Sequence, residues 1–375
     1  MNESRSARPD FLLALAALAL VTTGCLLILS ASSILAFNRY GDQLHFVKRQ
    51  LLFGGVGVMA LAWMQGLETQ VLRKKVTLML GVASFLLLAA LVPGIGRKVG
   101  GARRWLALGP LRFQPSELFK LAAMLFAADR LAKALDAGGT WKDALPSLAP
   151  LALGLLLILA EPDFGSTVLT SAMLLGLLFV AGMPTKWLFR VGLALVPLGV
   201  FLVLHSPYRL RRVEVFLDPW KDPNGAGFQI THSLMAFGTG GLFGAGLGEG
   251  KQKLFYLPEP HTDFIFATAG EELGLLGCAV ILLFFLFLLW RCWVLVLKAK
   301  DRFLKLASLG LTLFMGLQVL FNLFVVLGIV PTKGTTLPFL SSGGSALAID
   351  LMAIGLLLNF SKQVDREEHG LSGRS

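Results

Sequence analysis

The stretch FLLALAALALVTTGCLLILSASSILAF, residues 11–37, contains no charged side chain and as an α-helix would extend about 40 Å. The hydrocarbon core of a bilayer is about 30 Å thick, so this segment is long enough to cross it. The rest of the 375-residue chain is similar, because 55% of it is hydrophobic and only 15% is charged. A soluble domain has about 25% charged residues, and its helices keep a polar stripe that most of these segments lack. The composition therefore indicates an integral membrane protein.

Apolar runs of membrane-spanning length recur about ten times, which predicts an all-α polytopic membrane protein with one domain over residues 1–375. The first run is too long for the apolar part of a cleaved signal sequence, and further runs follow it. The clearest runs cover residues 11–37, 51–67, 76–92, 164–183, 187–204, 273–290 and 303–330, and weaker ones cover 116–134, 145–160 and 346–360.

Basic residues in the short connections predict the orientation, because short positively charged loops stay in the cytoplasm. With the N-terminal tail inside, the inner connections hold most of these residues, whereas the turn at 161–163 has none. We therefore expect cytoplasmic tails at 1–10 and 361–375, and a large outer loop at 206–266 between the seventh and eighth spans. The inner basic residues are Arg73, Lys74, Lys75, Arg130, Lys133, Lys142, Lys186, Arg190, Lys298, Lys300, Arg302 and Lys305.

Most of the remaining basic residues lie in long outer loops, where the net charge of +11 becomes informative. A single Arg there is best explained as a lipid-headgroup anchor. A cluster without acidic residues favours phosphate binding, because Arg pairs with phosphate through forked hydrogen bonds. Nucleic acid is not an expected partner, since these loops face away from the cytoplasm. The cluster at 93–115 contains Arg97, Lys98, Arg103, Arg104 and Arg112, and the second long loop begins with Arg209, Arg211 and Arg212.

Polar residues interrupt three of the apolar runs. Glu117 and Lys120 are three residues apart and therefore share a helix face, where they form either a structural pair or part of a site. Gln318 and Asn322 are four apart, and they either bond neighbouring helices or line a site. Asp350 lies early in the last span, and its partner is not evident from the sequence.

The large outer loop contains a glycine-rich stretch at 238–250, and glycines this dense allow tight turns and close approach to a ligand. Apolar residues around it, such as Leu242 and Phe243, indicate a segment that packs on the membrane surface or dips into it. Asp263 follows, directly before an apolar run. A carboxylate at such a boundary is partly desolvated, which raises its pKa and suits it to act as a general base. The alternative is a helix N-cap, a position that Asp also favours.

The cysteines and histidines indicate no metal centre. The three cysteines lie in or beside apolar spans, where free Cys behaves as a small hydrophobe, so no disulfide is implied. The five histidines show no paired ligand spacing, and no metal-binding residues are predicted.

A set of motifs in order along the chain resembles the SEDS family of shape, elongation, division and sporulation proteins. The resemblance covers nearly the whole chain, and two segments, 252–256 and 331–334, are similar to the cell-division branch rather than the elongation branch. The motifs are Arg-Trp-Leu at 104–106, Phe-Gln-Pro-Ser-Glu-Leu at 113–118, Glu-Pro-Asp-Phe-Gly at 161–165, Pro-Glu-Pro-His-Thr-Asp-Phe-Ile-Phe at 258–266, Pro-Thr-Lys-Gly at 331–334, Leu-Pro-Phe at 337–339 and Ser-Gly-Gly-Ser at 342–345.

The resemblance implies ten membrane helices and a peptidoglycan glycosyltransferase that polymerises lipid II at the division septum, on the outer face of the bacterial cytoplasmic membrane. It also implies a class B penicillin-binding protein and other divisome membrane proteins as partners. Asp263 falls on the family's essential aspartate and is the expected catalytic base. The residues expected to bind substrate are Trp105, Arg103, Arg104, Glu117, Lys120, Arg212, Glu259, His261 and Lys333.

The expected reaction is an inverting transfer that releases undecaprenyl pyrophosphate, with outer Arg and Lys side chains stabilising the leaving group. A divalent cation, Mg²⁺ or Mn²⁺, would help to neutralise that charge, and the polyprenyl chain would lie in a groove open to lipid. The sequence departs from the family pattern at Ser342, His232 and Asp350. At Ser342, we expect the last outer turn to pack differently from the family pattern.

Three other functions stay open at this point. A lipid II flippase would use the intramembrane polar residues as a route, although a transporter concentrates such groups near mid-membrane. An elongation-type polymerase would catalyse the same chemistry elsewhere in the cell. A scaffold for a partner enzyme would not require Asp263.

Overall fold

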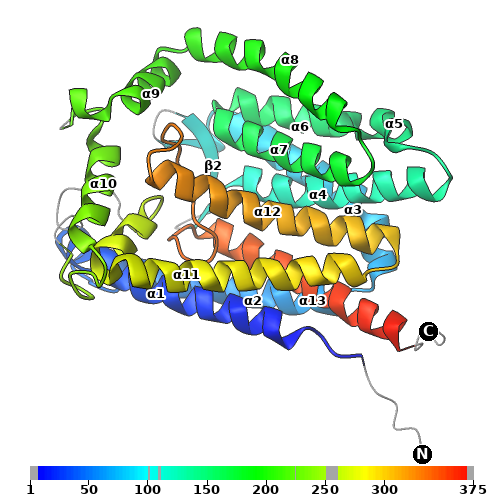
Figure 1. Cartoon of the computed structure of the whole chain (residues 1–375), viewed down its shortest axis with the longest axis horizontal. Coiled ribbons are helices and arrows are strands. Elements are labelled where there is room, and N and C mark those ends of the chain that lie inside the picture. Colours follow the sequence, from blue (N-terminus) through cyan, green and yellow to red (C-terminus); the bar gives the residue numbers. More distant parts are fainter. Residues whose placement is uncertain (1–6, 100–101, 109–110, 224, 251–260, 370–375) are drawn as a thin grey trace, which may run out of the picture.

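A computed structural model describes residues 7–99, 102–108, 111–223, 225–250 and 261–369. Figure 1 shows long helices that run side by side, with both ends of the chain at the same end of the bundle. In chain order the elements are α1 (Phe11–Tyr40), α2 (His45–Gly66), α3 (Thr69–Leu91), β1 (Gly96–Val99), β2 (Ala102–Leu108), β3 (Leu111–Phe113), α4 (Pro115–Asp136), α5 (Trp141–Ala144), η1 (Leu145–Leu148), α6 (Ala149–Ala160), α7 (Phe164–Val180), α8 (Thr185–Leu204), α9 (Pro207–Leu217), η2 (Pro219–Lys221), α10 (Phe228–Gly240), α11 (Ile265–Lys298), α12 (Arg302–Val326) and α13 (Ser345–Glu368).

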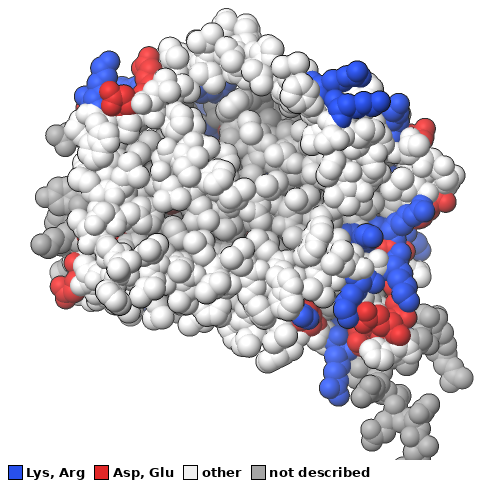
Figure 2. Space-filling view, viewed as in Figure 1, with Lys and Arg blue, Asp and Glu red and all other residues white. Residues whose placement is uncertain are grey.

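The prediction of a helical polytopic membrane protein is confirmed. Each expected span overlaps a helix. In the described part of the chain, seven helical segments are long and apolar enough to cross a bilayer, namely α1, α3, Trp141–Ala160, α8, α11, α12 and α13, and α7 is a shorter apolar helix. On the face shown in Figure 2, Lys, Arg, Asp and Glu lie mainly at the two ends of the bundle, with a largely uncharged belt between them. Such a belt is what a surface in contact with lipid tails requires.

The core lies along α4, α12 and α13, whose residues are buried on several sides. Glycines allow the backbones to approach closely at two contacts. A Cβ at Gly355 of α13 would lie 2.5 Å from the Leu61 carbonyl oxygen, and one at Gly310 of α12 would lie 3.1 Å from Met124 Cβ. In contrast, α8 has no buried residue. The polar residues of α4 and α12 are therefore held at the centre of the molecule.

The expectation of an all-α fold is corrected by a small sheet. Strands β1, β2 and β3 pair antiparallel in that order, so the basic stretch at 93–115 forms a sheet where the sequence suggested a loop. Its register sets Arg103 opposite Lys98 and Trp105 opposite Arg97. Because neighbouring side chains of a strand alternate between faces, Arg104 projects from the face opposite to Arg103 and Trp105.

The described part of the segment 206–266 is also more ordered than a flexible connector, because it contains α9, η2 and α10. After the glycine-rich stretch the chain enters α11, which is broken at Gly274, where the backbone has φ +66° and ψ −167°. The first part, Ile265–Leu273, is here called the half-helix. It begins two residues after Asp263.

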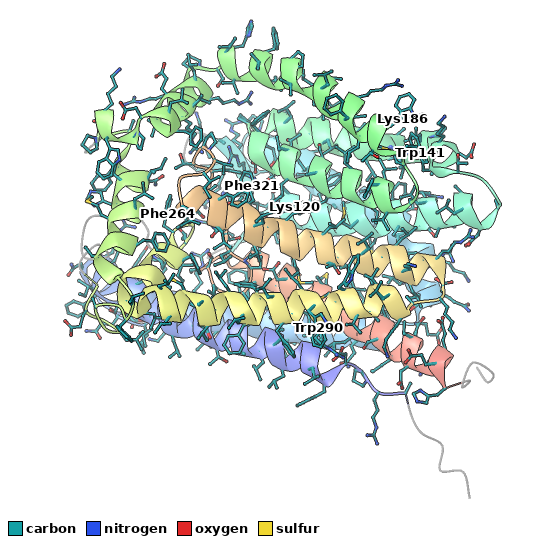
Figure 3. The ribbon with its side chains drawn as sticks, in the orientation of Figure 1. Lys120, Trp141, Lys186, Phe264, Trp290 and Phe321 are labelled. Carbon is teal, nitrogen blue, oxygen red and sulfur yellow. The ribbon has the colours of Figure 1, made fainter. Side chains whose placement is uncertain are left out.

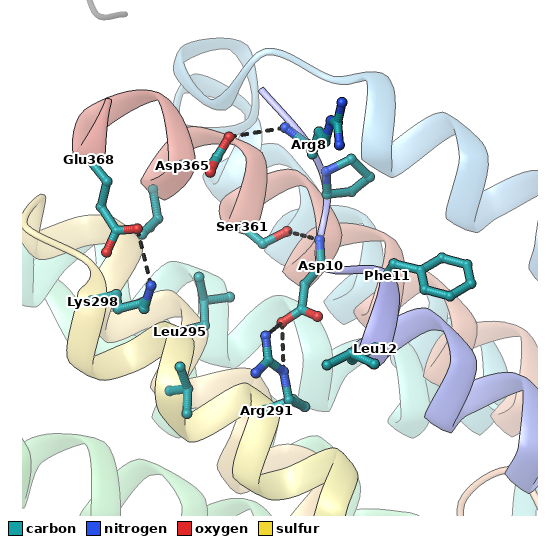
Figure 4. A pocket seen from close by; sticks show the side chains of 13 residues that line it. Arg8, Asp10, Phe11, Leu12, Arg291, Leu295, Lys298, Ser361, Asp365 and Glu368 are labelled. Atoms are coloured by element: carbon teal, nitrogen blue, oxygen red, sulfur yellow. Dashed lines mark hydrogen bonds and ion pairs between the residues drawn. The ribbon is translucent and has the colours of Figure 1, made fainter. Parts of the chain in front are cut away.

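At the end of the bundle that holds both termini, α1, α11 and α13 meet around Asp10. Its carboxylate accepts hydrogen bonds from the Arg291 guanidinium at 2.7 and 3.0 Å, and its backbone N–H donates to Ser361 Oγ. A pocket of about 390 Å³ lies beside these bonds, and it is flanked by the Lys298–Glu368 ion pair (Figure 4). These contacts tie the N-terminal segment to both other helices.

Candidate active site

The two polar motifs predicted inside the helices meet in the core. Lys120 Nζ of α4 donates to Glu117 Oε1 at 2.8 Å and to Gln318 Oε1 of α12 at 2.7 Å. The side chain of Lys120 is only 1% exposed, and that of Glu117 is 9% exposed. Figure 3 shows Lys120 in the interior of the bundle. Here the ammonium joins two helices and also neutralises a buried carboxylate.

One turn further along α12, Asn322 holds the segment that contains Asp263. Its side-chain N–H groups donate to the backbone oxygens of Asp263 at 3.0 Å and Thr335 at 2.6 Å. Asp263 is partly exposed, and a Cβ placed at Gly334 would lie 3.0 Å from its Oδ2 atom. The N-cap of the half-helix is Phe264, not Asp263. The alternative role of Asp263 as a helix cap is therefore not supported by the geometry.

A second charged cluster surrounds the turn between α6 and α7. Arg104 donates to the backbone oxygens of Glu161 and Pro162, and its Nη1 lies 4.0 Å from Asp163 Oδ2. Lys333 approaches from the segment between α12 and α13, with its Nζ 3.7 Å from Asp163 Oδ1 and 3.1 Å from Ser166 Oγ.

Gly165 makes room for the Lys333 side chain, because a Cβ there would lie 2.0 Å from Lys333 Cδ. Asp163 also caps α7 by accepting hydrogen bonds from the Ser166 backbone N–H and hydroxyl. Strand β2, the start of α7 and the segment between α12 and α13 are thus joined.

The electrostatics of this cluster are strongly perturbed. Burial, together with the charge of Asp163, raises the pKa of Glu161 to about 8, although Arg104 acts in the opposite direction. Burial would also raise the pKa of Asp163, but Lys333, Arg104 and the Ser166 hydrogen bonds hold it below its usual value. Burial lowers the pKa of Lys333 to about 8, against the attraction of Asp163. Shifts of this kind are common at functional sites.

Two further predicted residues lie around the same segments. Arg212 of α9 donates from Nη1 to the Thr332 backbone oxygen at 2.5 Å, next to Lys333. His261 lies in the core, where its ring packs on Phe46 with centroids 4.0 Å apart. Burial, together with Arg39 and Arg49, lowers the pKa of His261 to about 4. Its backbone oxygen accepts from the Ser342 N–H at 2.9 Å, so its location suits support of the loop before Asp263.

The remaining predicted residues lie outside these clusters. Arg103 and Trp105 are partly exposed on β2, and no contact among the described residues links them to Asp263. Glu259 lies outside the described residues. At Ser342, which departs from the family pattern, the backbone N–H bonds the loop before Asp263. This bond is made by the backbone and so does not depend on the side chain at this position.

Three acidic residues belong to these clusters although none of them was among the predicted site residues. Asp163 pairs with Lys333, and the Glu161 carboxyl is fully buried with no hydrogen-bond partner among the described residues. Asp350 of α13 is 3% exposed and lies within electrostatic range of Glu117 and Lys120. For Glu161 and Asp163, the sequence signal was the presence of two acidic residues in a turn that has no basic residue. For Asp350, only the packing of α13 against α4 identifies its neighbours.

This arrangement provides a partly exposed carboxylate beside a group of cations, which suits proton abstraction near a phosphate-bearing substrate. The fit to a divalent cation is poor in the described part of the chain, where no three His, Cys, Asp or Glu side chains gather into a ligand set. Among the described residues, Arg and Lys side chains are available to stabilise negative charge there.

Comparison with known proteins identifies relatives over almost the full length. The pattern of the cell cycle protein family named for FtsW, RodA and SpoVE matches residues 10–366. Stage V sporulation protein E of Bacillus subtilis is 41% identical over 96% of this chain and 98% of its own length. A probable peptidoglycan glycosyltransferase FtsW of Trichlorobacter lovleyi is 42% identical over 95% of this chain and 94% of its own length.

Solved structures agree with the sequence matches. A chain from a peptidoglycan synthase complex that coordinates polymerization and crosslinking has a TM-score of 0.78 and 30% identity, covering 95% of this chain and 98% of that one. The rod shape determining protein RodA of Thermus thermophilus has a TM-score of 0.69 and 29% identity, covering 95% and 97%. The resemblance seen in the motifs is confirmed, and this chain belongs to the FtsW, RodA and SpoVE family of cell cycle proteins.

Proposed function

We propose that this protein is a peptidoglycan glycosyltransferase that polymerises lipid II into glycan strands. The names of its FtsW relatives support this activity. The observation that carries the proposal is the setting of Asp263, which Asn322 holds by its backbone against Gly334, next to Lys333. A partly exposed carboxylate is thereby fixed beside the Arg104–Asp163–Lys333 cluster.

In the proposed reaction, the Asp263 carboxylate takes the proton of the acceptor sugar's 4-hydroxyl as its oxygen attacks the donor's anomeric carbon. The bond from that carbon to the pyrophosphate oxygen breaks, and its electrons leave with undecaprenyl pyrophosphate. One displacement inverts the anomeric centre. Basic side chains stabilise the charge that grows on the leaving group, and such electrostatic stabilisation is often the largest contribution to catalysis.

The same proposal treats residues 1–375 as one domain and gives it an orientation in the membrane. We place the tails 1–10 and 361–375 in the cytoplasm, with ten crossings between them. Two observations support this placement: both termini lie at one end of the bundle, and basic residues concentrate in the short connections at that end. The Asp263 end and the loop 206–266 then face outward, and this is called the outer end below.

The polyprenyl chain of the substrate requires a path within the bilayer. Figure 2 shows a hollow beneath α8, and α8 has no fully buried residue. We propose that this hollow, open to lipid, receives the polyprenyl chain while the sugars lie at the outer end. A divalent cation such as Mg²⁺ or Mn²⁺ would arrive with the pyrophosphate of the substrate, and we assign it no ligands here.

The division-type relatives support a proposal for the partners and the location of this protein. We propose that a class B penicillin-binding protein cross-links the strands that this protein makes, together with other divisome membrane proteins at the septum of the cytoplasmic membrane. The similarity to a chain of a peptidoglycan synthase complex supports a partner of this kind.

The test is strand formation from labelled lipid II by the purified protein, with and without its class B penicillin-binding protein. We would compare wild type with Asp263→Asn, and use Asp218→Asn as a control because Asp218 is an exposed aspartate of the same outer loop. Strands from wild type and the control, but not from Asp263→Asn, support the proposal. Equal polymerisation by Asp263→Asn would remove its role as the base. If no protein made strands but wild type moved lipid II across vesicles, the flippase alternative would be favoured.

A further inference from the structure

The glycine-rich loop that precedes the half-helix supplies the backbone hydrogen bonds that are missing at the break in α11. In an unbroken helix, Leu275 and Leu276 would donate their N–H groups to the carbonyls of Glu271 and Glu272. Instead they donate to the carbonyls of Gly241 and Leu242, at 2.9 and 3.1 Å. The freed carbonyls of Glu271 and Glu272 accept from the N–H groups of Ala245 and Gly246, at 2.9 and 3.0 Å. The loop thus substitutes for one turn of helical hydrogen bonding.

This geometry requires glycine on both sides of the contact. Gly274 has φ +66°, and a Cβ there would lie 2.3 Å from the Gly244 backbone nitrogen. Gly244 has φ +81°, and a Cβ there would lie 2.2 Å from the Glu272 backbone oxygen. Side chains larger than hydrogen would push the two segments apart. The loop is therefore built onto α11 and is not a free connector.

The height of this contact within the membrane can be estimated from two helices. The Asp10–Arg291 ion pair marks one edge of the uncharged segments of α1 and α11. Ser30 lies 20 residues from Asp10 along α1, which is about 30 Å of helix and equals the thickness of the hydrocarbon core. Ser30 Oγ in turn hydrogen-bonds the Glu272 carboxylate. The opposite edge of the core therefore falls near the Ser30–Glu272 contact.

Leu275 lies 16 residues from Arg291 along the unbroken part of α11, or about 24 Å. This level is about 6 Å inside the outer edge of a 30 Å core. The loop backbone bonded to Leu275 and Leu276 must lie at the same depth. Its paired N–H and C=O groups suit an environment without water, in which each unpaired backbone group costs several kcal/mol.

The side chains of the loop match that depth. Residues 241–248 contain no charged or hydroxyl group, and Leu242, Phe243 and Leu247 are 59%, 80% and 63% exposed. They continue the exposed apolar surface of α11, where Leu275 and Leu276 are 61% and 53% exposed. Because that surface faces lipid, a continuation of it at the same level faces lipid as well.

We infer that residues 241–248 form a membrane-inserted loop, with Leu242, Phe243 and Leu247 among the acyl chains of the outer leaflet. The half-helix connects this loop, through Glu271 and Glu272, to Asp263 at its other end. The insertion itself is independent of any catalytic role of Asp263.

The test is the depth of a nitroxide label in lipid nanodiscs, measured by its exposure to oxygen and to a water-soluble nickel chelate. Cys25, Cys278 and Cys292 would first be replaced by alanine. Single cysteines would then be placed at Phe243 and, as a second position in the loop, at Leu247. Leu283, which is 62% exposed on α11, serves as the lipid control, and Lys221, which is exposed beside two aspartates, serves as the water control.

Insertion predicts that the oxygen-to-nickel exposure ratio at Phe243 and Leu247 exceeds that at Lys221 several-fold and approaches the ratio at Leu283. Nickel exposure equal to that of Lys221 at both loop positions would overturn the inference, because the loop would then lie in water. Low exposure to both reagents would overturn it as well, since a protein surface, and not lipid, would then cover the loop.

Discussion

The buried pair Glu117–Lys120 offers a test that separates a structural role from a role in the site. Lys120→Met keeps the length of the side chain but leaves the Glu117 carboxylate without its cation and Gln318 Oε1 without its donor. Removing one partner of a buried ion pair costs about 3–5 kcal/mol, because the other charge stays buried and uncompensated. Lys120 is almost fully enclosed, so we expect a cost in this range.

The double variant Glu117→Gln with Lys120→Met removes both charges and keeps a polar group at position 117. Replacing a complete buried pair is often neutral or stabilising, so we expect its free energy of unfolding to lie within about 1 kcal/mol of wild type. Thermal unfolding in nanodiscs would be compared for wild type, both single variants and the double variant. Strand formation from lipid II would be measured on the same four preparations.

If the pair lines the substrate site, the double variant recovers its melting temperature but makes no strands. Recovery of both properties would show that the pair only supports the fold. Single variants that melt like wild type would refute the energetic reasoning itself, because the charges would then be solvated. A control for preparation quality is Lys221→Met, which removes an exposed lysine of the outer loop.

Three further predictions concern other parts of the molecule. Gly274→Ala should lower the melting temperature, because Gly274 has φ +66° and an added Cβ would meet the Gly244 backbone. Gly238→Ala should leave the melting temperature unchanged, because there is open space around Gly238. Phe243→Asp should reduce stability in nanodiscs by up to about 3 kcal/mol, since it moves a charge into hydrocarbon, while Phe243→Leu should behave like wild type. In the folded state the pKa of Glu161 is raised from 4.5 to about 8. Between pH 4.5 and pH 8, Glu161 is therefore protonated in the native state and ionised in the unfolded state. Wild type should therefore lose stability as pH rises through this window, and Glu161→Gln should lack that slope in thermal melts from pH 5 to 8.

The membrane helices could be predicted from the sequence because their pattern is local. Apolar runs of sufficient length have few alternatives in lipid, and each expected run overlaps a helix. The pairing of Glu117 with Lys120 also followed from a spacing of three residues. The bond from Lys120 to Gln318 could not be predicted, because it depends on how α4 packs against α12.

The outer segments were harder to predict because their structure depends on contacts between distant residues. The expected span 273–290 began at the correct place for the lipid-facing part of α11, since the apolar run starts there. The half-helix before it was missed, because its two glutamates and the glycine at 274 resemble the end of a loop. Only the hydrogen bonds with residues 241–246 explain why a helix precedes Gly274.

The basic residues that the sequence analysis treated as one group fall into two groups in the structure. One group bonds other parts of the protein, and the other does not form ion pairs within the described residues. Arg104, Arg212 and Lys333 already bond backbone carbonyls, Ser166 or Asp163. They hold the turns that surround Asp263, and a phosphate could reach them only by competing with those bonds.

The strands carry a second group of cations. Arg97, Lys98 and Arg112 are exposed and Arg103 is partly exposed, and none of the four forms an ion pair within the described residues. Arg97 and Lys98 are placed opposite Trp105 and Arg103 in the sheet, so charge and an aromatic surface lie together. Because unpaired Arg and Lys can bind phosphate without first breaking a bond, we expect the strands to make the initial contact with the pyrophosphate. We expect the tethered residues to act mainly by holding the turns next to Asp263, and the strand residues to meet most of the phosphate charge.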